Sequence, residues 1–366
     1  MDQPTQTRIE SLDVLRGLAL ALMLLVNNPG SWSAVYGPFL HAQWHGLTPT
    51  DLVFPFFLFV VGASMACSLR GQIQGAGLPW ISIIKRSFLL FFIGFILQII
   101  PFDQAPDSWR IMGVLQRIGL CFLLVAIMIA IIKERWLLLA GVIILVAYWL
   151  ILLSAGQAPY SVENNLVRHI DIAILGSTHM WHVKGMPFDP EGLLSTMSAS
   201  ITVLSGYLIS AKVLHHKTDR QQILNLLSVA VVLLAIGLTW SVWHPINKNL
   251  WTGSFVLVSS AAACFSLALI ILLCRVPGIK TVLYGLRVYG GNPIFIYVAA
   301  WLFSVFLNRF TVTVADQSNS IKGWIYSNFQ SVMSDKLASL LFATLFTAFF
   351  YLVAWVLYKK RIFIKL

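Results

Sequence analysis

Residues 251–274 read WTGSFVLVSSAAACFSLALIILLC, a run of 24 residues without one charged side chain. A helix of about 20 apolar residues is long enough to cross the hydrocarbon core of a bilayer. Nine similar runs occur elsewhere in the chain, at residues 12–28, 51–69, 82–101, 111–132, 136–154, 192–211, 222–241, 287–308 and 335–358. The sequence therefore predicts an all-α integral membrane protein, a bundle of about ten transmembrane helices.

The overall composition favours the same fold class. Of the 366 residues, 58% are hydrophobic and 11% are charged, whereas soluble domains are about 45–50% apolar and about 25% charged. The mean hydropathy is +0.82. No polar block between the apolar runs is large enough to fold alone, so residues 1–366 are predicted to form a single transmembrane domain.

The net charge of +11 suggests either a nucleic-acid partner or a membrane topology signal. The basic residues lie in short clusters between apolar runs, which is typical of topology signals. We therefore expect membrane lipid as a partner and no nucleic acid. Ten spans place both termini on one side, and that side holds 17 of the 25 Lys and Arg residues. The positive-inside rule then predicts that both termini are cytoplasmic.

The ninth run contains Gly290-Gly291-Asn292-Pro293, which predicts a broken or kinked helix. Membrane proteins tolerate such backbone where it lines a cavity. The four cysteines show no metal-binding spacing, and the chain has no Walker loop, GxSxG or HExxH motif. We expect the cysteines to be small buried residues and no metal to be bound.

The first outward loop combines several polar groups close to the membrane. Asn27 ends the first run, His41 and His45 follow in the loop, and Asp51 begins the second run. Such groups are costly near hydrocarbon and are usually kept for function. Asp51 could cap the second helix, orient a histidine, or do both. Either histidine could serve as a base, or both could be surface residues.

Three further clusters each allow a functional and a structural interpretation. Arg117, next to Gln116, lies inside a predicted span, so it must pair, line a wet cavity or reach the interface. Asp189 and Glu191 precede the sixth run and could begin a helix or hold a cationic amine. Trp251 follows Asn247 and Lys248 in a tight outer turn, where it could belong to an interfacial belt or stack on a sugar.

These segments resemble the heparan-alpha-glucosaminide N-acetyltransferase family of transmembrane acyltransferases over essentially the whole chain. The resemblance is carried by SLDVLRG at 11–17, Val26-Asn27, HAQWHGLTPTDLVFPFF at 41–57, GVLQR at 113–117, DPEG at 189–192 and NKNLWT at 247–252. It implies transfer of an acetyl group from cytosolic acetyl-CoA, as co-substrate, to the amine of a glucosamine-type sugar on the other side of the membrane.

Carried over by residue, the resemblance places the catalytic histidine at His41 and its partner amide at Asn27. Two departures stand out. His45 occupies a position where the family has an asparagine, and the large luminal domain of the lysosomal relative is lacking, so a small amino sugar is the expected acceptor. A bacterial inner-membrane location is expected, and a homodimer is plausible by resemblance.

Transfer to an amine requires a base, and the reference pKa of histidine suits that task. His41 would deprotonate the amine and Asn27 would stabilise the oxyanion, or an acetyl-histidine would form first. Arg16 precedes Asn27 by eleven residues, about 16 Å along a helix, so it could meet the CoA phosphates. A transporter and a scaffold are the rival functions.

The remaining candidates fall into two groups. The residues expected to contact the sugar are Trp44, His45, Gln116, Arg117, Asp189, Glu191, Asn247, Lys248 and Trp251. Those expected to contact the CoA moiety are Arg16, Arg70, Arg86, Arg287 and Asn292.

Overall fold

The computed structural model describes residues 10–73, 77–213, 218–314 and 317–364, most of which are helical. The helices are α1 (Glu10–Asn27), α2 (Val53–Ile73), α3 (Trp80–Ile99), α4 (Val114–Ile131), α5 (Glu134–Leu153), α6 (Leu166–Leu175), α7 (Leu193–Val213), α8 (Asp219–Trp240), α9 (Gly253–Leu273), α10 (Lys280–Tyr289), α11 (Pro293–Arg309), α12 (Ile321–Gln330) and α13 (Asp335–Lys359). Two small antiparallel hairpins pair β1 (His182–Val183) with β2 (Met186–Pro187), and β3 (Thr311–Val314) with β4 (Gln317–Ser320).

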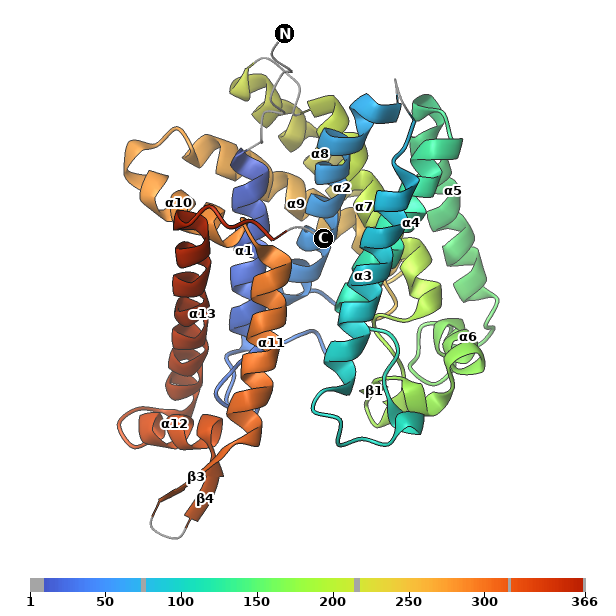
Figure 1. Cartoon of the computed structure of the whole chain (residues 1–366). Helices are drawn as coiled ribbons and strands as arrows, with labels where there is room; N and C mark the ends of the chain where they lie inside the picture. The colour runs from blue at the N-terminus through green and yellow to red at the C-terminus, as the bar shows by residue number, and fades with distance from the viewer. Residues whose placement is uncertain (1–9, 74–76, 214–217, 315–316, 365–366) are drawn as a thin grey trace.

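The helices confirm an all-α membrane bundle. Among the described residues, eight helices are long and apolar enough to cross a membrane, and the bent pair α10–α11 makes a ninth. The remaining predicted span, residues 12–28, corresponds to α1. This helix carries Glu10, Asp13 and Arg16 and is too polar by the same standard. It nevertheless lies in the middle of the bundle and contacts α2, α9, α11 and α13 (Figure 1).

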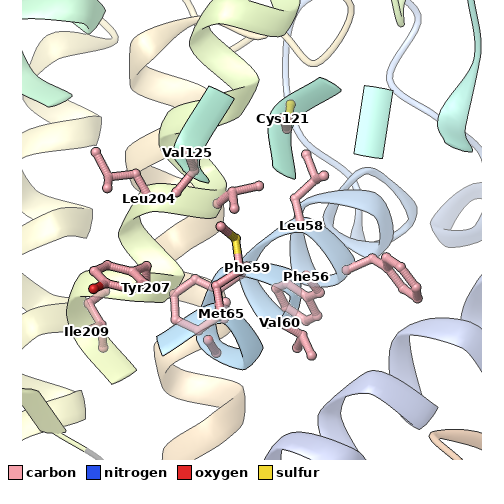
Figure 2. Packing of buried hydrophobic residues seen from close by; sticks show 14 of the residues in the cluster. Phe56, Leu58, Phe59, Val60, Met65, Cys121, Val125, Leu204, Tyr207 and Ile209 are labelled. Carbon is pink, nitrogen blue, oxygen red and sulfur yellow. The ribbon is translucent and has the colours of Figure 1, made fainter. Parts of the chain in front are cut away.

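The spans divide into central and peripheral helices. Helices α2, α4, α7 and α9 are buried over 61–72% of their spans, whereas α3, α5, α8 and α13 are buried over 17–28%. The peripheral helices therefore present most of their surface to lipid. Figure 2 shows the central packing, in which side chains of α2 and α7, such as Phe59 and Tyr207, meet those of α4.

Two glycines allow α2 and α7 to approach closely. A Cβ added at Gly62 would collide with the carbonyl oxygen of Val203, and one added at Gly206 would collide with that of Phe59. Small residues at helix contacts are typical of membrane bundles, where van der Waals packing drives association. The pair forms a rigid centre from which the polar loops extend.

The ninth span is broken as the sequence predicted. Helices α10 and α11 meet at 74°, and the break falls between Tyr289 and Pro293. At the break, the Asn292 amide donates to the Ile362 carbonyl at 2.9 Å and accepts from the Ile364 amide at 2.8 Å. Asn292 therefore fastens the C-terminal segment to the bend.

The two ends of the bundle differ. The N-terminal end of α1, the C-terminal end of α13 and α10 lie at one end, which we call the inner end (Figure 1). Helix α12 and both hairpins lie at the opposite, outer end. This arrangement agrees with an even number of crossings, while the cytoplasmic placement of the termini stays a prediction. Helices α6 and α12 were not predicted, because ten-residue helices are marginal without tertiary packing.

Candidate active site

Asp51 is held rigidly at the start of α2. A 3₁₀ turn, Pro49–Leu52, leads into the helix and is closed by a capping box with Thr48. One Asp51 oxygen, Oδ2, accepts from the Thr48 amide at 3.0 Å, the Thr48 hydroxyl at 2.9 Å and the Ala42 amide at 3.1 Å. The side chain is 1% exposed. Asp51 thus caps the helix from inside its first turn and also fixes the histidine loop.

The other Asp51 oxygen binds His41. Oδ1 lies 2.7 Å from Nδ1 of the imidazole, and an ionised carboxylate can only accept. Nδ1 must therefore carry the proton, which leaves Nε2 as an acceptor. The His41 side chain is 45% exposed. The pair has the form of a general base oriented by a carboxylate.

His41 opens onto a cavity of about 350 Å³, within the usual size range for small-molecule sites. The cavity is formed by the outer ends of α1 and α3, the start of α4, helix α11 and three outer loops. Its lining consists of Met23, Leu24, Asn27, Asn28, His41, Gln98, Arg110, Val114, Trp181, Pro190, Glu191, Tyr297, Ala300, Trp301 and Ser304. The structure thus brings together His41 and Asn27, as expected from the sequence.

Lys248 lies beside the base. Its Nζ is 3.1 Å from Nδ1 and 3.3 Å from Nε2 of His41, and 3.7 Å from Oδ1 of Asp51. Burial lowers the pKa of Lys248, against the opposing negative charges of Asp51 and Glu191. The residue was expected to contact the sugar, and the structure places it against the imidazole and its carboxylate.

His45, the second candidate base, is not among the residues that line the cavity. Its Nδ1 lies 3.2 Å from the Asn247 amide nitrogen, and the Gly46 amide donates to the Ile246 carbonyl at 2.9 Å. Burial, with a contribution from the charge of Lys184, lowers its pKa. Trp44 anchors the same loop by donating to the Tyr160 carbonyl at 2.6 Å. His45, Asn247 and Trp44 therefore hold the loop that presents His41.

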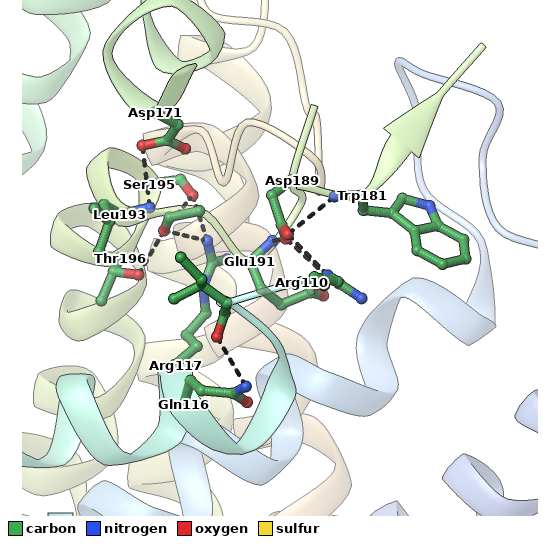
Figure 3. A network of polar contacts seen from close by, with 12 residues as sticks. Arg110, Gln116, Arg117, Asp171, Trp181, Asp189, Glu191, Leu193, Ser195 and Thr196 are labelled. Atoms are coloured by element: carbon green, nitrogen blue, oxygen red, sulfur yellow. Dashed lines mark hydrogen bonds and ion pairs between the residues drawn. The ribbon is translucent and has the colours of Figure 1, made fainter. Parts of the chain in front are cut away.

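A charged cluster of Arg110, Asp189 and Glu191 adjoins the cavity (Figure 3). Arg110 makes two 2.8 Å bonds to Asp189 and one of 2.7 Å to Glu191, and its guanidinium lies 5.2 Å from the Trp181 ring. Burial opposes the charge of Arg110, but these carboxylates outweigh it and raise its pKa. Asp189 is fully buried and also accepts backbone amides. Only Glu191 of this acidic pair lines the cavity.

Arg117 lies deeper, outside the cavity lining. It is fully buried, so it does not reach the interface. It donates to the Gly192 carbonyl at 3.1 Å and to the Ser195 hydroxyl, and lies 5.1 Å from the Trp251 ring. Within the part of the chain that the structure describes, its Nε and Nη1 have no hydrogen-bond partner.

Two neighbours of Arg117 also serve the packing. Trp251 is 1% exposed and donates to Thr202 at 3.1 Å, so it is neither an interfacial belt residue nor an open stacking platform. Gln116 is fully buried and donates to the Ile111 carbonyl at 3.0 Å.

Asp171 caps α7 through the Leu193 and Leu194 amides at 3.1 Å each, and burial raises its pKa to about 6.

The expected CoA-binding residues lie toward the inner end. Arg16 donates to Asp13 at 2.7 Å and to Ser64 at 2.6 Å. Arg86 interacts electrostatically with Arg16. Its guanidinium carbon lies 4.9 Å from the centre of the Phe122 ring.

The other three expected CoA ligands are placed differently. Arg287 pairs with Glu10 at 2.9 Å, and Asn292 is engaged by the C-terminal segment. The side chain of Arg70 lies outside the described residues. Arg16 and Arg86 are therefore the two cations that the structure brings together.

Sequence reasoning missed one wall of the cavity, formed by Gln98, Trp181, Tyr297, Trp301 and Ser304. Trp301 joins the two helices of this wall by donating to the Leu97 carbonyl at 2.9 Å. The only local signals were a glutamine near the end of an apolar run and a tyrosine after the helix break. Among the described residues, no group of three or more His, Cys, Asp or Glu could hold a metal ion.

Comparisons with known proteins find similarity to one enzyme family. Residues 8–170 match the model of the family described as heparan-alpha-glucosaminide N-acetyltransferase, catalytic. The chain is similar to the heparan-alpha-glucosaminide N-acetyltransferases over nearly its whole length. The Mus musculus enzyme is 28% identical and the Homo sapiens enzyme 29% identical, each over 98% of this chain. The chain spans about 60% of the length of these relatives.

The match to the heparan-alpha-glucosaminide N-acetyltransferase family model includes the first part of the cavity. Asn27, His41, Asp51, Gln98 and Arg110 all fall within residues 8–170. Glu191, Tyr297 and Lys248 fall outside that range and join the site through the fold.

Proposed function

We propose that this protein transfers an acetyl group from cytosolic acetyl-CoA to the amine of a glucosamine-type sugar on the outer side of a bacterial inner membrane. The observation that carries the proposal is the His41–Asp51 pair, at a cavity that both His41 and Asn27 line. The names of the two relatives support N-acetyl transfer to a glucosaminide. The 350 Å³ cavity suits one sugar ring and an acetyl group better than a long polymer.

His41 is the general base in this proposal. Because Nδ1–H is held by Asp51 at 2.7 Å, Nε2 receives the proton of the amine as the amine nitrogen attacks the thioester carbonyl. The new N–C bond forms, the C–S bond breaks, and the imidazolium returns its proton to the departing CoA thiolate. General base catalysis of this kind contributes about 10²–10⁴-fold.

Asn27 supplies the donor for the developing oxyanion. It ends α1 at the cavity, and its amide makes no hydrogen bond to other described residues, so it is available to a ligand. A positioned donor costs no reorganisation at the moment of reaction, and removing one typically lowers the rate by about 10²–10³-fold.

The acyl donor would enter from the inner end. The positive charge of Arg16, on α1, acts on that of Arg86, on α3, and a phosphate bound near both would lower this repulsion. Arginine is also well suited to phosphate recognition. The separation of about 16 Å between Arg16 and Asn27 along α1 would let one extended donor reach both. Arg70 and Arg287 are secondary candidates for the same phosphates.

Thiol release tests the proposal directly. Purified protein given acetyl-CoA and glucosamine should release free CoA thiol, and His41→Ala should reduce the rate to background. His45→Gln is the matched control, because His45 faces Asn247, and it should keep most of the activity. Background release from the wild-type protein with every amino sugar tried would overturn the proposal.

The order of steps can be tested separately. Radiolabelled acetyl-CoA added without acceptor would label the protein if an acetyl-histidine forms. Label that is stable on wild-type protein, absent from His41→Ala and released by glucosamine would establish the two-step route. Absence of label at full thiol-release activity would favour direct transfer.

The broken span favours a second candidate function. Transporters use discontinuous helices, and α10 and α11 meet at 74°. An amino-sugar transporter would move labelled glucosamine into vesicles without consuming acetyl-CoA. Uptake that persists in His41→Ala and needs no thioester would replace the enzyme assignment with this one.

A further inference from the structure

Three polar side chains on the cavity wall have no role in the acetyl-transfer steps above. Gln98 ends α3, Tyr297 lies in the first part of α11, and Glu191 precedes α7. Neither the Gln98 amide nor the Tyr297 hydroxyl makes a hydrogen bond to any residue that the structure describes. Polar groups that line a cavity without protein partners are available to a ligand, and leaving them unpaired is costly.

The charge of this wall is negative. Arg110 contributes one positive charge and Asp189 and Glu191 contribute two negative charges, so the cluster has a formal net charge of −1. Asp189 is fully buried and both of its oxygens bind Arg110. Glu191 binds Arg110 through Oε2 alone, and its Oε1 has no partner among the described residues. The cluster therefore keeps one excess negative charge, and Glu191 is the carboxylate of the cluster that lines the cavity.

Aromatic rings complete the wall. Trp181 and Trp301 line the same cavity, and Trp301 is fixed by its bond to the Leu97 carbonyl at 2.9 Å. Indole rings offer a flat apolar surface of the kind that the faces of a sugar ring can cover. A carboxylate, a phenol, a primary amide and two indoles match a small cation that also carries hydroxyl groups.

We propose that Glu191, Tyr297 and Gln98 form the acceptor subsite, in which Glu191 attracts the ammonium group and the other two residues bind sugar hydroxyls. This inference rests on the proposed function and assigns the acceptor side of its cavity. It has a direct consequence for turnover. Acetylation removes the positive charge of the amine, so the product loses its attraction to Glu191 and leaves more readily than the substrate.

Steady-state kinetics of the full-length protein test the two neutral residues. Tyr297→Phe and Gln98→Leu should each raise the KM for glucosamine by about 3–10-fold, the range expected for one lost neutral hydrogen bond. The KM for acetyl-CoA should stay unchanged. Tyr284→Phe is the matched control, because Tyr284 lies on α10 and is exposed, and it should behave as wild type. Unchanged glucosamine KM values in both cavity variants would overturn the subsite.

The charge argument has its own test. Glu191→Gln should raise the KM for glucosamine about tenfold or more, as for loss of a charged partner, and should leave inhibition by N-acetylglucosamine nearly unchanged. The ratio of the product Ki to the substrate KM should therefore fall. A ratio equal to that of the wild type would remove Glu191 from the subsite.

A binding measurement separates failure of the subsite from failure of the function. Glucosamine should raise the unfolding temperature of the wild-type protein, and Tyr297→Phe should need about 3–10-fold more glucosamine for the same shift, as expected for one lost hydrogen bond. This readout needs no acetyl transfer. Normal thiol release with unaltered glucosamine binding in all three variants would overturn the subsite alone. Specific binding without thiol release would overturn the proposed function and leave the subsite in place.

Discussion

Nδ1 of His41 lies 2.7 Å from Oδ1 of Asp51, while the second oxygen of Asp51 accepts three hydrogen bonds from Thr48 and Ala42. The carboxylate is therefore fully occupied and has a single orientation. Because it can only accept, it selects the imidazole tautomer that leaves Nε2 as an acceptor. The contact with Asp51 therefore fixes the orientation of His41, as a general base requires.

Asp51→Asn should lower kcat for acetyl transfer by about 10²–10⁴-fold. An asparagine amide can donate to Nδ1, which would favour the opposite tautomer and place a proton on Nε2. The KM for acetyl-CoA should change little, since Asp51 lies far from the inner end. The measurement is thiol release at saturating substrates.

The control for that variant is Thr48→Val, which removes one donor to Asp51 and leaves the His41 contact intact. It should stay within a few-fold of wild type, as expected for one hydrogen bond. If Asp51→Asn kept the wild-type kcat, the carboxylate would be only a helix cap.

The sequence could predict the features that depend on neighbouring residues. Apolar runs located the spans to within a few residues, and Gly290-Gly291-Asn292-Pro293 predicted the break between α10 and α11. His41 and Asp51 are separated by ten residues, so their pairing is a property of one loop.

The rest of the cavity depends on contacts between distant segments. The hydrogen bond from Trp301 to Leu97 joins residues 204 positions apart, and no local pattern marks Tyr297 as part of the same wall. The sequence also does not show which polar and aromatic side chains are buried. Trp251 and Arg117 could face solvent or lie inside on the sequence alone. Both are buried and bind side chains of α7, Thr202 and Ser195 respectively.

Arg86→Met should raise the KM for acetyl-CoA by about 10-fold or more, the range expected for lost contacts with a charged group. The KM for S-acetylpantetheine, which lacks the nucleotide phosphates, should not change, because Arg86 lies near Arg16 and not near the acyl end. Arg135→Met is the matched control at the same end of the bundle and should behave as wild type. Equal increases for the two donors would show that Arg86 does not bind the phosphates.

Gly62→Ala should lower the free energy of unfolding by about 1–3 kcal/mol, the usual cost of overpacking. Replacing a helical glycine by alanine ordinarily stabilises by about 0.5–1 kcal/mol, but here the new Cβ would collide with the Val203 carbonyl of α7. Thermal unfolding in detergent should therefore show a lower midpoint.

Gly285→Ala on α10 provides the comparison for Gly62→Ala. The nearest atoms to an added Cβ there belong to Tyr351 at 3.7 Å, an ordinary contact distance. This variant should be as stable as wild type or slightly more so. A Gly62→Ala protein with the same midpoint as Gly285→Ala would show that α2 and α7 can separate at no cost.

His244 should make the protein less stable in acid. Its Nε2 accepts from the Gly253 amide at 2.8 Å, and Nδ1 lies 3.0 Å from the Tyr160 hydroxyl. Trp149, Tyr160 and Trp240 surround the ring, and burial lowers its pKa to about 3. The native state therefore favours the neutral imidazole.

The direction of the change in stability with pH follows from proton binding at His244. Between pH 6.5 and about 3 the unfolded chain binds a proton at His244 that the folded protein does not. This contribution to stability is complete above pH 6.5 and is lost as pH falls through that window, by at most about 1.4 kcal/mol per pH unit. Asp171, with its pKa raised to about 6, acts in the opposite direction.

His244→Gln isolates the imidazole, because glutamine can accept from the Gly253 amide and does not titrate. Unfolding midpoints measured in detergent between pH 7.5 and 4.5 should fall less steeply for this variant than for wild type, while the contribution of Asp171 cancels in the comparison. His182→Gln, at an exposed histidine of the outer loop, should follow the wild-type curve. Parallel curves for His244→Gln and wild type would show that the ring takes up a proton in the folded protein without breaking its bond to Gly253.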